Sequence, residues 1–274
     1  MWSKEEASRL LGNVIGEGRT AEVLEYGEGR ILKLYREEVP GHHVDWEYRI
    51  SNFVYEQGVS TPKTYGQITA EGRQGIVYQQ IHGPSLLKLI GAKPWLIASC
   101  GRQMAALHHS LHQLEGIGED GEQKKRLAQN IIAAPMLDMD EKSKILSQLR
   151  LLPDGNKLCH GDFHPDNVLK DDRLWIIDWM TAVPGEPAAD AARTLIMFSI
   201  GAVPKHASFF SKLFLGIARK RMTSQYLREY LRLSGLSMKD INPWVLPVAA
   251  ARLVEWLPVS EKEQLVREIR RRLR

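Results

Sequence analysis

An aspartate, an asparagine and a second aspartate lie close together in one stretch of the chain, and their types suit phosphoryl transfer. Within Leu158–Asp178, Asp162 is followed five positions later by Asn167, and Asp178 ends an apolar run. Transfer of a γ-phosphoryl group needs an oriented acceptor hydroxyl and Mg²⁺ ions that bridge phosphate oxygens, with little covalent work by the protein. The spacing therefore predicts Asp162 as the base and Asn167 and Asp178 as metal ligands.

Two apolar runs between these predicted ligands indicate a β-hairpin. Asn167–Leu169 and Leu174–Ile177 are separated by the polar turn Lys170–Arg173, which is a hairpin signal. A rigid hairpin would hold both metal ligands at its base. The alternative is a polar turn whose aspartate and asparagine only cap backbone groups. Hydrophilic residues set so tightly against apolar runs each need a partner, and this favours the phosphoryl-transfer interpretation.

The segment resembles the catalytic loop and metal loop of the aminoglycoside phosphotransferase family, which are small-molecule kinases with a protein-kinase-like fold. Protein kinases carry H-R-D, an asparagine five residues after that aspartate, and then D-F-G. This chain has His160-Gly161-Asp162 and Asp178-Trp179-Met180 at those places. The resemblance implies a bilobal α+β fold, with a small antiparallel sheet and one helix in residues 1–82 and a larger, mainly helical lobe in residues 83–274.

A segment near the start matches the phosphate-covering loop that the resemblance implies. Residues 16–23 read GEGRTAEV and follow the kinase pattern G-x-G-x-x-x-x-V, with Gly16, Gly18 and Val23 at its defining positions. Glycines permit a tight turn and a close approach of backbone amides to phosphates. Taken alone, a glycine pair between β-prone runs is more often an ordinary hairpin. The position of the segment ahead of a strand with a lysine favours the phosphate loop.

That lysine is Lys33, in the apolar run Arg30–Tyr35, and the resemblance makes it the phosphate-contacting lysine. Its alternative is a solvent-facing lysine on an amphipathic strand. Glu47 lies in a segment with helical spacing of apolar residues, and the resemblance makes it the partner of Lys33. Asp45 and Glu56 are the competing partners, and Glu47 could also be a solvated carboxylate in a first helical turn.

Two further strands, Lys63–Thr69 and Gly75–Gln80, complete the predicted small sheet. The residues that follow match the hinge of the resembled family. The resemblance implies that backbone groups near Gln80 and Ile81 hydrogen-bond the adenine of ATP.

Histidines and one more aspartate stand outside this pattern. His108 and His112 are one helical turn apart and could form half of a zinc site. The sequence shows no third ligand of suitable context, so packing or hydrogen bonding is the preferred role. Asp190 is expected to cap or brace the helix that follows it. An A-P-E element is absent from the sequence, which argues against a protein kinase.

Composition fits a two-lobed enzyme. The chain has 274 residues, of which 43% are hydrophobic, and only two cysteines, Cys100 and Cys159, without metal-ligand spacing. This favours a reducing, cytoplasmic location.

The segment Met1–Glu6 is too charged for a signal peptide, and Leu195–Val203 is about half the length of a membrane span. We expect a monomer or homodimer that binds neither membrane nor nucleic acid, since the basic end Val266–Arg274 is explained by a solvated last helical turn.

Charge gives one indication of the acceptor. Nine bases and three acids lie between Phe198 and Val259, where an acceptor-binding helical subdomain is expected; the bases are Lys205, Lys212, Arg219, Lys220, Arg221, Arg228, Arg232, Lys239 and Arg252. A polycationic antibiotic prefers an acid-lined pocket. If those cations face the acceptor, a neutral or anionic hydroxylated metabolite is favoured.

The sequence thus predicts an ATP- and Mg²⁺-dependent kinase that phosphorylates a hydroxyl of a small molecule, and not a polycationic aminoglycoside. Two alternatives stay open. One is an aminoglycoside O-phosphotransferase that confers antibiotic resistance. The other is a nucleotide-binding pseudokinase scaffold, against which the complete polar set argues.

Overall fold

The computed structural model describes residues 10–118, 121–200 and 209–274, with only the helical backbone for residues 209–215. The described chain forms two compact units. The first contains the residues up to Leu86 together with Asp166–Thr181, and the second contains Leu87–Pro165 and Ala182–Arg274. The α+β fold class is confirmed, with an antiparallel sheet in the first unit and mostly helices in the second. The predicted lobe division at residues 82 and 83 stays a prediction.

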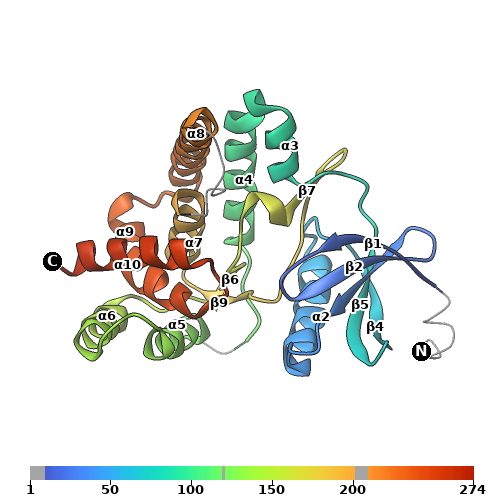
Figure 1. Ribbon diagram of the computed structural model, residues 1–274, viewed down its shortest axis with the longest axis horizontal. Helices are drawn as coiled ribbons and strands as arrows, with labels where there is room; N and C mark the ends of the chain where they lie inside the picture. The colour runs from blue at the N-terminus through green and yellow to red at the C-terminus, as the bar shows by residue number, and fades with distance from the viewer. Residues whose placement is uncertain (1–9, 119–120, 201–208) are drawn as a thin grey trace. The chain divides into compact units, whose positions relative to one another are not determined.

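The first unit is built on a five-stranded antiparallel sheet of strand order β1-β2-β3-β5-β4. Its strands are β1 (Leu11–Glu17), β2 (Ala21–Tyr26), β3 (Arg30–Tyr35), β4 (Thr64–Ala70) and β5 (Arg73–Gln79). Helix α2 (Gly41–Glu56) connects β3 to β4 and lies along one side of the sheet (Figure 1).

Alternation along β3 explains both faces of this sheet. Leu32 and Leu34 are buried in a core with residues of β2 and β5. Tyr35 points to the other face, where it packs with Val44 of α2 and with Ile76. Successive side chains of a strand point to opposite faces, so Lys33 shares the face of Tyr35 that α2 covers.

The predicted hairpin between the metal ligands is confirmed and belongs to the first unit. Strands β7 (Val168–Lys170) and β8 (Leu174–Ile176) pair antiparallel. The short helix η2 (Pro165–Asn167) leads into β7. Backbone hydrogen bonds tie the hairpin to the unit, because Lys170 N–H donates to the carbonyl of Pro84 at 2.9 Å and Ile176 N–H donates to that of Ser60 at 2.8 Å.

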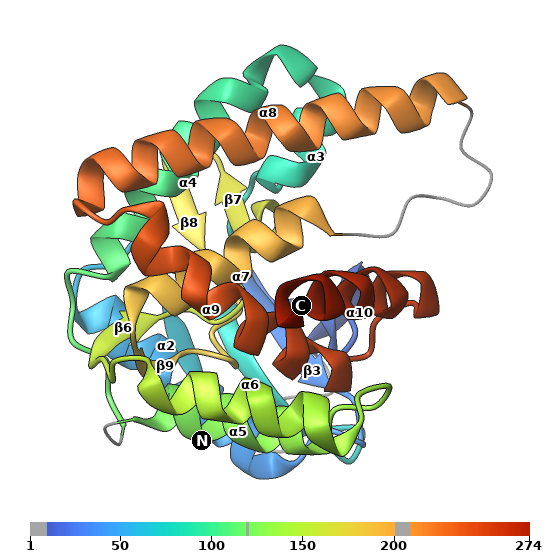
Figure 2. The same cartoon turned by 90° about the vertical axis from the view of Figure 1, so that its left-hand side faces the viewer.

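The second unit is mainly helical. Its helices are α3 (Leu86–Ala92), α4 (Ile97–Leu111), α5 (Glu122–Ala133), α6 (Met139–Leu151), α7 (Pro187–Ser199), α8 (Phe209–Ser234), α9 (Met238–Ala251) and α10 (Val259–Leu273), with the short turns η1 (Pro94–Leu96) and η3 (Arg252–Val254). Helix α8 lies alongside α4 in both views (Figures 1 and 2), and α7 packs on α9. A two-stranded sheet is formed by β6 (Lys157–Cys159), which directly precedes the predicted catalytic loop in the sequence, and β9 (Val183–Gly185).

Three predictions from the sequence fall partly or wholly outside what the structure describes. The charged start Met1–Glu6 and the last three residues of the apolar segment Leu195–Val203 lie outside the described residues. Of the predicted basic set, Lys205 lies outside them and the side chain of Lys212 is not described. Among the described helices, none combines the length and the apolar character that a bilayer span requires. Both cysteines are buried, and neither forms a disulfide.

Candidate active site

The Lys33 ammonium lies between two carboxylates of the first unit. Lys33 Nζ is 2.7 Å from Glu47 Oε1 and 2.8 Å from Asp178 Oδ1. Strand β3, helix α2 and the segment after β8 therefore meet at one cation. The structure brings Lys33 and Glu47 together as the sequence predicts, whereas the competing Asp45 accepts a hydrogen bond from Gln67 Nε2 at 2.9 Å.

Two tyrosines complete the surroundings of Glu47, which is only 1% exposed. Tyr35 Oη donates to Glu47 Oε2 at 2.7 Å, and Tyr78 Oη donates to Glu47 Oε1 at 3.4 Å. Burial raises the pKa of Glu47, and the Lys33 charge opposes that rise. Burial disfavours the charged form of Lys33, yet the carboxylates of Asp178 and Glu47 together raise its pKa. We conclude that the ammonium is held charged in a largely buried position.

The two predicted metal ligands lie at the ends of the β7–β8 hairpin. Asn167 is buried, and its carbonyl accepts the N–H of Ile177 at 3.1 Å, which brings the two ends of the hairpin together. Asp178 has a φ of 68°, a left-handed conformation that is uncommon for residues other than glycine. Its side chain is 38% exposed. The neighbouring Trp179 is buried, and its Nε1 donates to Thr61 Oγ1 at 2.9 Å, so a packed indole anchors the strained position.

The predicted phosphate loop is the turn between β1 and β2. Gly16 pairs with Val23 across these strands. The Gly18 N–H donates to the carbonyl of Ala21 at 2.8 Å and so closes the turn. A Cβ atom on either glycine would meet its nearest described neighbour only at 3.5 Å. The fold itself therefore does not require glycine at these two positions.

The predicted adenine-binding residues follow β5. The N–H of Gln80 donates to the carbonyl of Gly29 at 3.0 Å. This bond uses the one backbone donor of Gln80 inside the protein. The backbone N–H that would donate to the predicted adenine would accordingly belong to a neighbouring residue such as Ile81.

Asp162 belongs to the second unit and lies between two cationic or potentially cationic groups. Its Oδ2 is 3.4 Å from His164 Nε2, and its Oδ1 is 3.5 Å from Arg193 Nη2. Burial would raise the pKa of Asp162, but the hydrogen bond with His164 and the Arg193 charge outweigh it and hold that pKa well below its usual range. His160 Nδ1 accepts the N–H of Asp162 at 3.2 Å. Asp162 is thus an ionised carboxylate on a braced loop.

Asp190 braces this loop from helix α7. Its Oδ2 accepts the N–H of His160 at 2.6 Å, and its Oδ1 accepts that of Gly161 at 3.0 Å. Gly161 has a φ of 74°, a conformation that glycine adopts at little cost. Asp190 was expected to cap or brace the helix that follows it. The capping expectation is wrong, since the N-cap of that helix is Glu186, and the Asp190 carboxylate bonds to N–H groups of the predicted catalytic loop.

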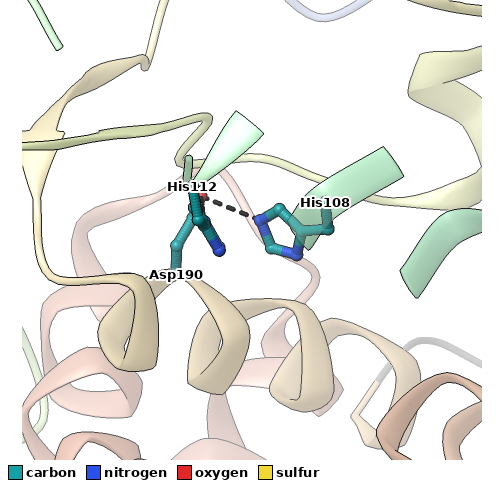
Figure 3. A group of neighbouring side chains, drawn as sticks. All are labelled: His108, His112 and Asp190. Carbon is teal, nitrogen blue, oxygen red and sulfur yellow. Dashed lines mark hydrogen bonds and ion pairs between the residues drawn. The ribbon is translucent and has the colours of Figure 1, made fainter. Parts of the chain in front are cut away.

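Asp190 also contacts the two helical histidines, which Figure 3 shows converging on it. Its Oδ2 lies 3.0 Å from His108 Nε2 and 3.4 Å from His112 Nε2. The Nδ1 atoms of the histidines lie 2.6 Å from Tyr226 Oη and 2.7 Å from Tyr230 Oη. The sequence did not show a third possible metal ligand beside the two histidines, and the structure places Asp190 there. The three side chains could hold a metal ion. Because both nitrogens of each ring already have a protein partner, hydrogen bonding accounts for the cluster.

Sequence reasoning did not identify Arg193 or Glu255 as site residues. Arg193 Nη1 lies 2.7 Å from Glu255 Oε1, while its Nη2 faces Asp162. The signal available in the sequence was an arginine one helical turn after Asp190. Helical geometry places such residues on one face, so an arginine beside a loop-bracing aspartate was a candidate neighbour of Asp162.

Comparison with solved structures finds the same fold in several phosphotransferases. An aminoglycoside-3'-phosphotransferase of type VIII aligns with a TM-score of 0.63 at 19% identity, over 90% of this chain and 98% of the other. The Streptomyces rimosus aminoglycoside phosphotransferase APH(3'')-Id, in complex with ADP and streptomycin, aligns with a TM-score of 0.57 at 15% identity, over 86% and 91%. A choline/ethanolamine kinase family protein from Mesorhizobium loti aligns with a TM-score of 0.55 at 16% identity, over 95% and 86%.

No curated protein matches the sequence. A family model, in contrast, matches residues 14–222, and that model describes the phosphotransferase enzyme family. The match spans the Gly16–Val23 turn, Lys33, Asp162 and Asp178, and continues into α8. This chain therefore belongs to the phosphotransferase enzyme family and is a small-molecule kinase.

Proposed function

We propose that this kinase transfers the γ-phosphoryl group of Mg·ATP to a hydroxyl of a small, neutral or anionic metabolite. The observation that carries the proposal is the contact of Lys33 with Glu47 and Asp178. A buried ammonium beside an exposed carboxylate is a suitable place for phosphate and metal together, since phosphoryl transfer depends on positioning and charge stabilisation.

The donor groups of the first unit fit a magnesium ion. Mg²⁺ prefers oxygen ligands and is usually held by one or two carboxylates plus substrate phosphates. Asp178 offers two carboxylate oxygens, of which the Lys33 contact uses one, and Asn167 offers an amide oxygen. Asp178 and Asn167 would hold the metal, which would neutralise charge on the phosphates. Lys33 would contact the phosphates while Glu47 keeps its ammonium in place.

The remaining ATP contacts are assigned to backbone groups. The turn from Gly16 through Gly18 to Val23 would cover the phosphates, because neither glycine carries a side chain that keeps a ligand away from the backbone. The residues Gln80 and Ile81 would contact adenine, with Gln80 contributing its carbonyl because its N–H is already bonded to Gly29.

We assign to Asp162 the role of accepting the proton of the acceptor hydroxyl. A general base must be ionised at the working pH and must be oriented toward its substrate. Its low pKa makes Asp162 a weak base, so its main contribution is to orient the hydroxyl and to accept the proton as the oxygen–phosphorus bond forms. His160 and Asp190 hold the loop that carries it.

The acceptor class rests on charge. Glu255, which is linked to Asp162 through Arg193, contacts two arginines, with Oε1 2.7 Å from Arg193 and Oε2 3.1 Å from Arg252. A carboxylate neutralised in this way is a poor partner for an ammonium of a polycationic antibiotic. On helix α8 the bases Lys220, Arg221 and Arg228 are exposed, so this helix presents positive charge to solvent.

An aminoglycoside acceptor is the second candidate, and a specific observation favours it. Two of the structural relatives are named as aminoglycoside phosphotransferases, and one of them contains streptomycin. A pseudokinase scaffold is the third candidate, against which Lys33, Asp162, Asn167 and Asp178 all argue by being present. The two buried cysteines, which form no disulfide, support a reducing, cytoplasmic location.

Thermal unfolding in the presence of nucleotide tests the nucleotide half of the proposal. A ligand that binds only the native state raises stability by about 2.7 kcal/mol when its concentration is a hundredfold above Kd. We expect Mg·ATP to raise the Tm of the wild-type protein, and Asp178→Asn to lose the part of this rise that depends on Mg²⁺. Asp45→Asn, which changes an aspartate bonded to Gln67, is the matched control. An equal rise in wild type and Asp178→Asn would contradict the metal assignment.

A further inference from the structure

Five charged residues of the second unit form a continuous series of ion pairs that begins at Asp162. We call this series the ion-pair chain; in order, its members are Asp162, Arg193, Glu255, Arg252 and Glu261. Arg193 joins Asp162 at 3.5 Å and Glu255 at 2.7 Å, and Arg252 joins Glu255 at 3.1 Å and Glu261 at 3.5 Å. The chain connects the catalytic loop to the first turn of α10.

The two arginines of the ion-pair chain are unusual in their burial. The Arg193 side chain is 18% exposed and that of Arg252 is 5% exposed. Within the described residues, Arg193 Nε and Arg252 Nη1 are buried donors without a hydrogen-bond partner. A buried donor left unpaired destabilises the folded state. Stability therefore does not explain why these two arginines are buried, and another role has to be sought.

The distances within the ion-pair chain show that Arg193 contacts Glu255 more closely than it contacts Asp162. Its short contact is with Glu255, whereas Asp162 lies 0.8 Å farther from the nearest guanidinium nitrogen, at 3.5 Å against 2.7 Å. A tight bidentate pair between Arg193 and Asp162 would occupy both carboxylate oxygens of Asp162, which must accept the proton of the acceptor hydroxyl. A looser contact keeps Asp162 ionised and oriented while leaving it able to accept that proton.

We propose that Arg193 is a positioning residue for Asp162 and that Glu255 fixes Arg193, so that the segment before α10 sets the orientation of the catalytic carboxylate. This inference rests on the proposed function, because it assigns Asp162 to the acceptor proton. Arg193 on Oδ1 and His164 on Oδ2 together define the plane of the carboxylate. Arg193, His164 and His160 are charged or titratable groups of the described second unit that act on the Asp162 carboxylate.

A purely structural role is the competing explanation. Arg193 could simply hold the segment around Glu255 against helix α7. The two roles differ in what they predict for kcat. The Arg193 charge contributes to the low pKa of Asp162 under either role, but only a positioning role predicts that kcat falls in a variant that folds and keeps its KM for ATP.

The test compares Arg193→Lys, Arg193→Met and Glu255→Gln with wild type. Arg232→Met serves as the matched control, because it removes another Arg–Glu contact of the same unit, the exposed pair of Arg232 with Glu229 on α8. Carbon-13 NMR gives the pKa of the Asp162 carboxyl, assigned with Asp162→Asn. Hydrolysis of Mg·ATP, with water as the acceptor, gives kcat and KM without knowledge of the natural acceptor.

We expect Arg193→Met to raise the pKa of Asp162 and to lower kcat by about tenfold or more, with KM for ATP within about twofold of wild type. Arg193→Lys should keep most of both properties, since it retains the charge, and Glu255→Gln should fall between the two. Arg232→Met should match wild type. If the pKa of Asp162 and kcat stay at wild-type values in Glu255→Gln and in Arg193→Met, the inference is overturned.

Folding and function can be separated in this experiment. If Arg193→Met does not fold, Glu255→Gln and Arg193→Lys still decide, because an unchanged pKa of Asp162 and an unchanged kcat in Glu255→Gln contradict the inference. If the wild-type protein hydrolyses no ATP, the proposed function is in doubt, while the NMR pKa of Asp162 still tests the contact with Arg193. Failure of one proposal is thereby distinguished from failure of the other.

Discussion

Lys33 and Asp178 are separated by 145 positions in the sequence, and their side chains meet at 2.8 Å. The contact joins strand β3 to the residue that follows the β7–β8 hairpin. Glu47 contacts the same ammonium from helix α2. A single cation thus links the predicted metal ligand to the predicted phosphate-binding strand.

Removal of the Lys33 charge should destabilise the fold as well as abolish ATP binding. Lys33→Met leaves Glu47 buried without its cation, and breaking a buried pair in this way costs about 3–5 kcal/mol. The double variant Lys33→Met/Glu47→Gln should recover part of that loss, because it removes the buried charge, yet it should still not bind ATP. Urea unfolding and calorimetric ATP titration measure the two effects. Lys63→Met, at an exposed position, is the control and should change the free energy of unfolding by less than about 0.5 kcal/mol. A similarly small change in the free energy of unfolding of Lys33→Met would contradict the account.

Alanine substitutions in the β1–β2 turn should separate ligand binding from folding. Gly16→Ala and Gly18→Ala add a Cβ that meets nothing in the described structure closer than 3.5 Å, so stability should change by less than about 1 kcal/mol. Affinity for Mg·ATP should fall if phosphates approach this backbone. Gly75→Ala is the contrasting control, because its Cβ would lie 2.7 Å from Leu32 Cδ1 and 3.1 Å from the carbonyl oxygen of Lys33, and this variant should lose stability. Unchanged ATP affinity in both turn variants would remove the phosphate-loop assignment.

The buried cluster around Asp190 should make stability depend on pH. Burial and the neighbouring His112 lower the pKa of His108 from 6.5 to about 4, although Asp190 opposes the shift. The unfolded chain therefore binds more protons than the folded protein between these values, and stability falls as the pH drops through this window. The expected loss between about pH 7.5 and pH 5 is about 2 kcal/mol for this one group.

Urea unfolding at the two pH values measures this loss. His108→Gln should lower stability at both values but remove most of the difference between them. His42→Gln, which changes an exposed histidine of α2, should keep the wild-type difference. A His108→Gln protein with the full wild-type pH dependence would show that another group is responsible.

The parts of the fold and site that sequence predicted well are those determined by local patterns. The turn Lys170–Arg173 between two apolar runs specified the β7–β8 hairpin. Helical spacing placed Glu47 beside the apolar stripe of α2, although only the structure distinguishes it from Asp45. Strand alternation placed Lys33 on the same face as Tyr35, but only the structure shows that α2 covers this face and that it is not turned to solvent.

Contacts made by distant segments could not be predicted in the same way. The position of Tyr78 against Glu47 depends on the pairing of β3 with β5, where Lys33 is opposite Ile76. Asp190 was expected to cap or brace the helix that follows it, but its carboxylate bonds to the N–H groups of His160 and Gly161, 30 and 29 positions earlier. A local pattern identifies a polar residue and its element, whereas its partner is set by tertiary packing.

The central claim is that Asp162 serves the transfer of phosphate from ATP to a small-molecule hydroxyl, and one measurement tests it most directly. The protein is incubated with Mg·ATP labelled in the γ-phosphoryl oxygens and a metabolite extract to which pooled aminoglycosides are added, and labelled phosphate esters are sought by mass spectrometry. The account predicts a labelled ester of a neutral or anionic metabolite with wild type, and none with Asp162→Asn, which should still bind Mg·ATP. A labelled aminoglycoside would contradict the acceptor class, and equal labelling by Asp162→Asn would contradict the central claim.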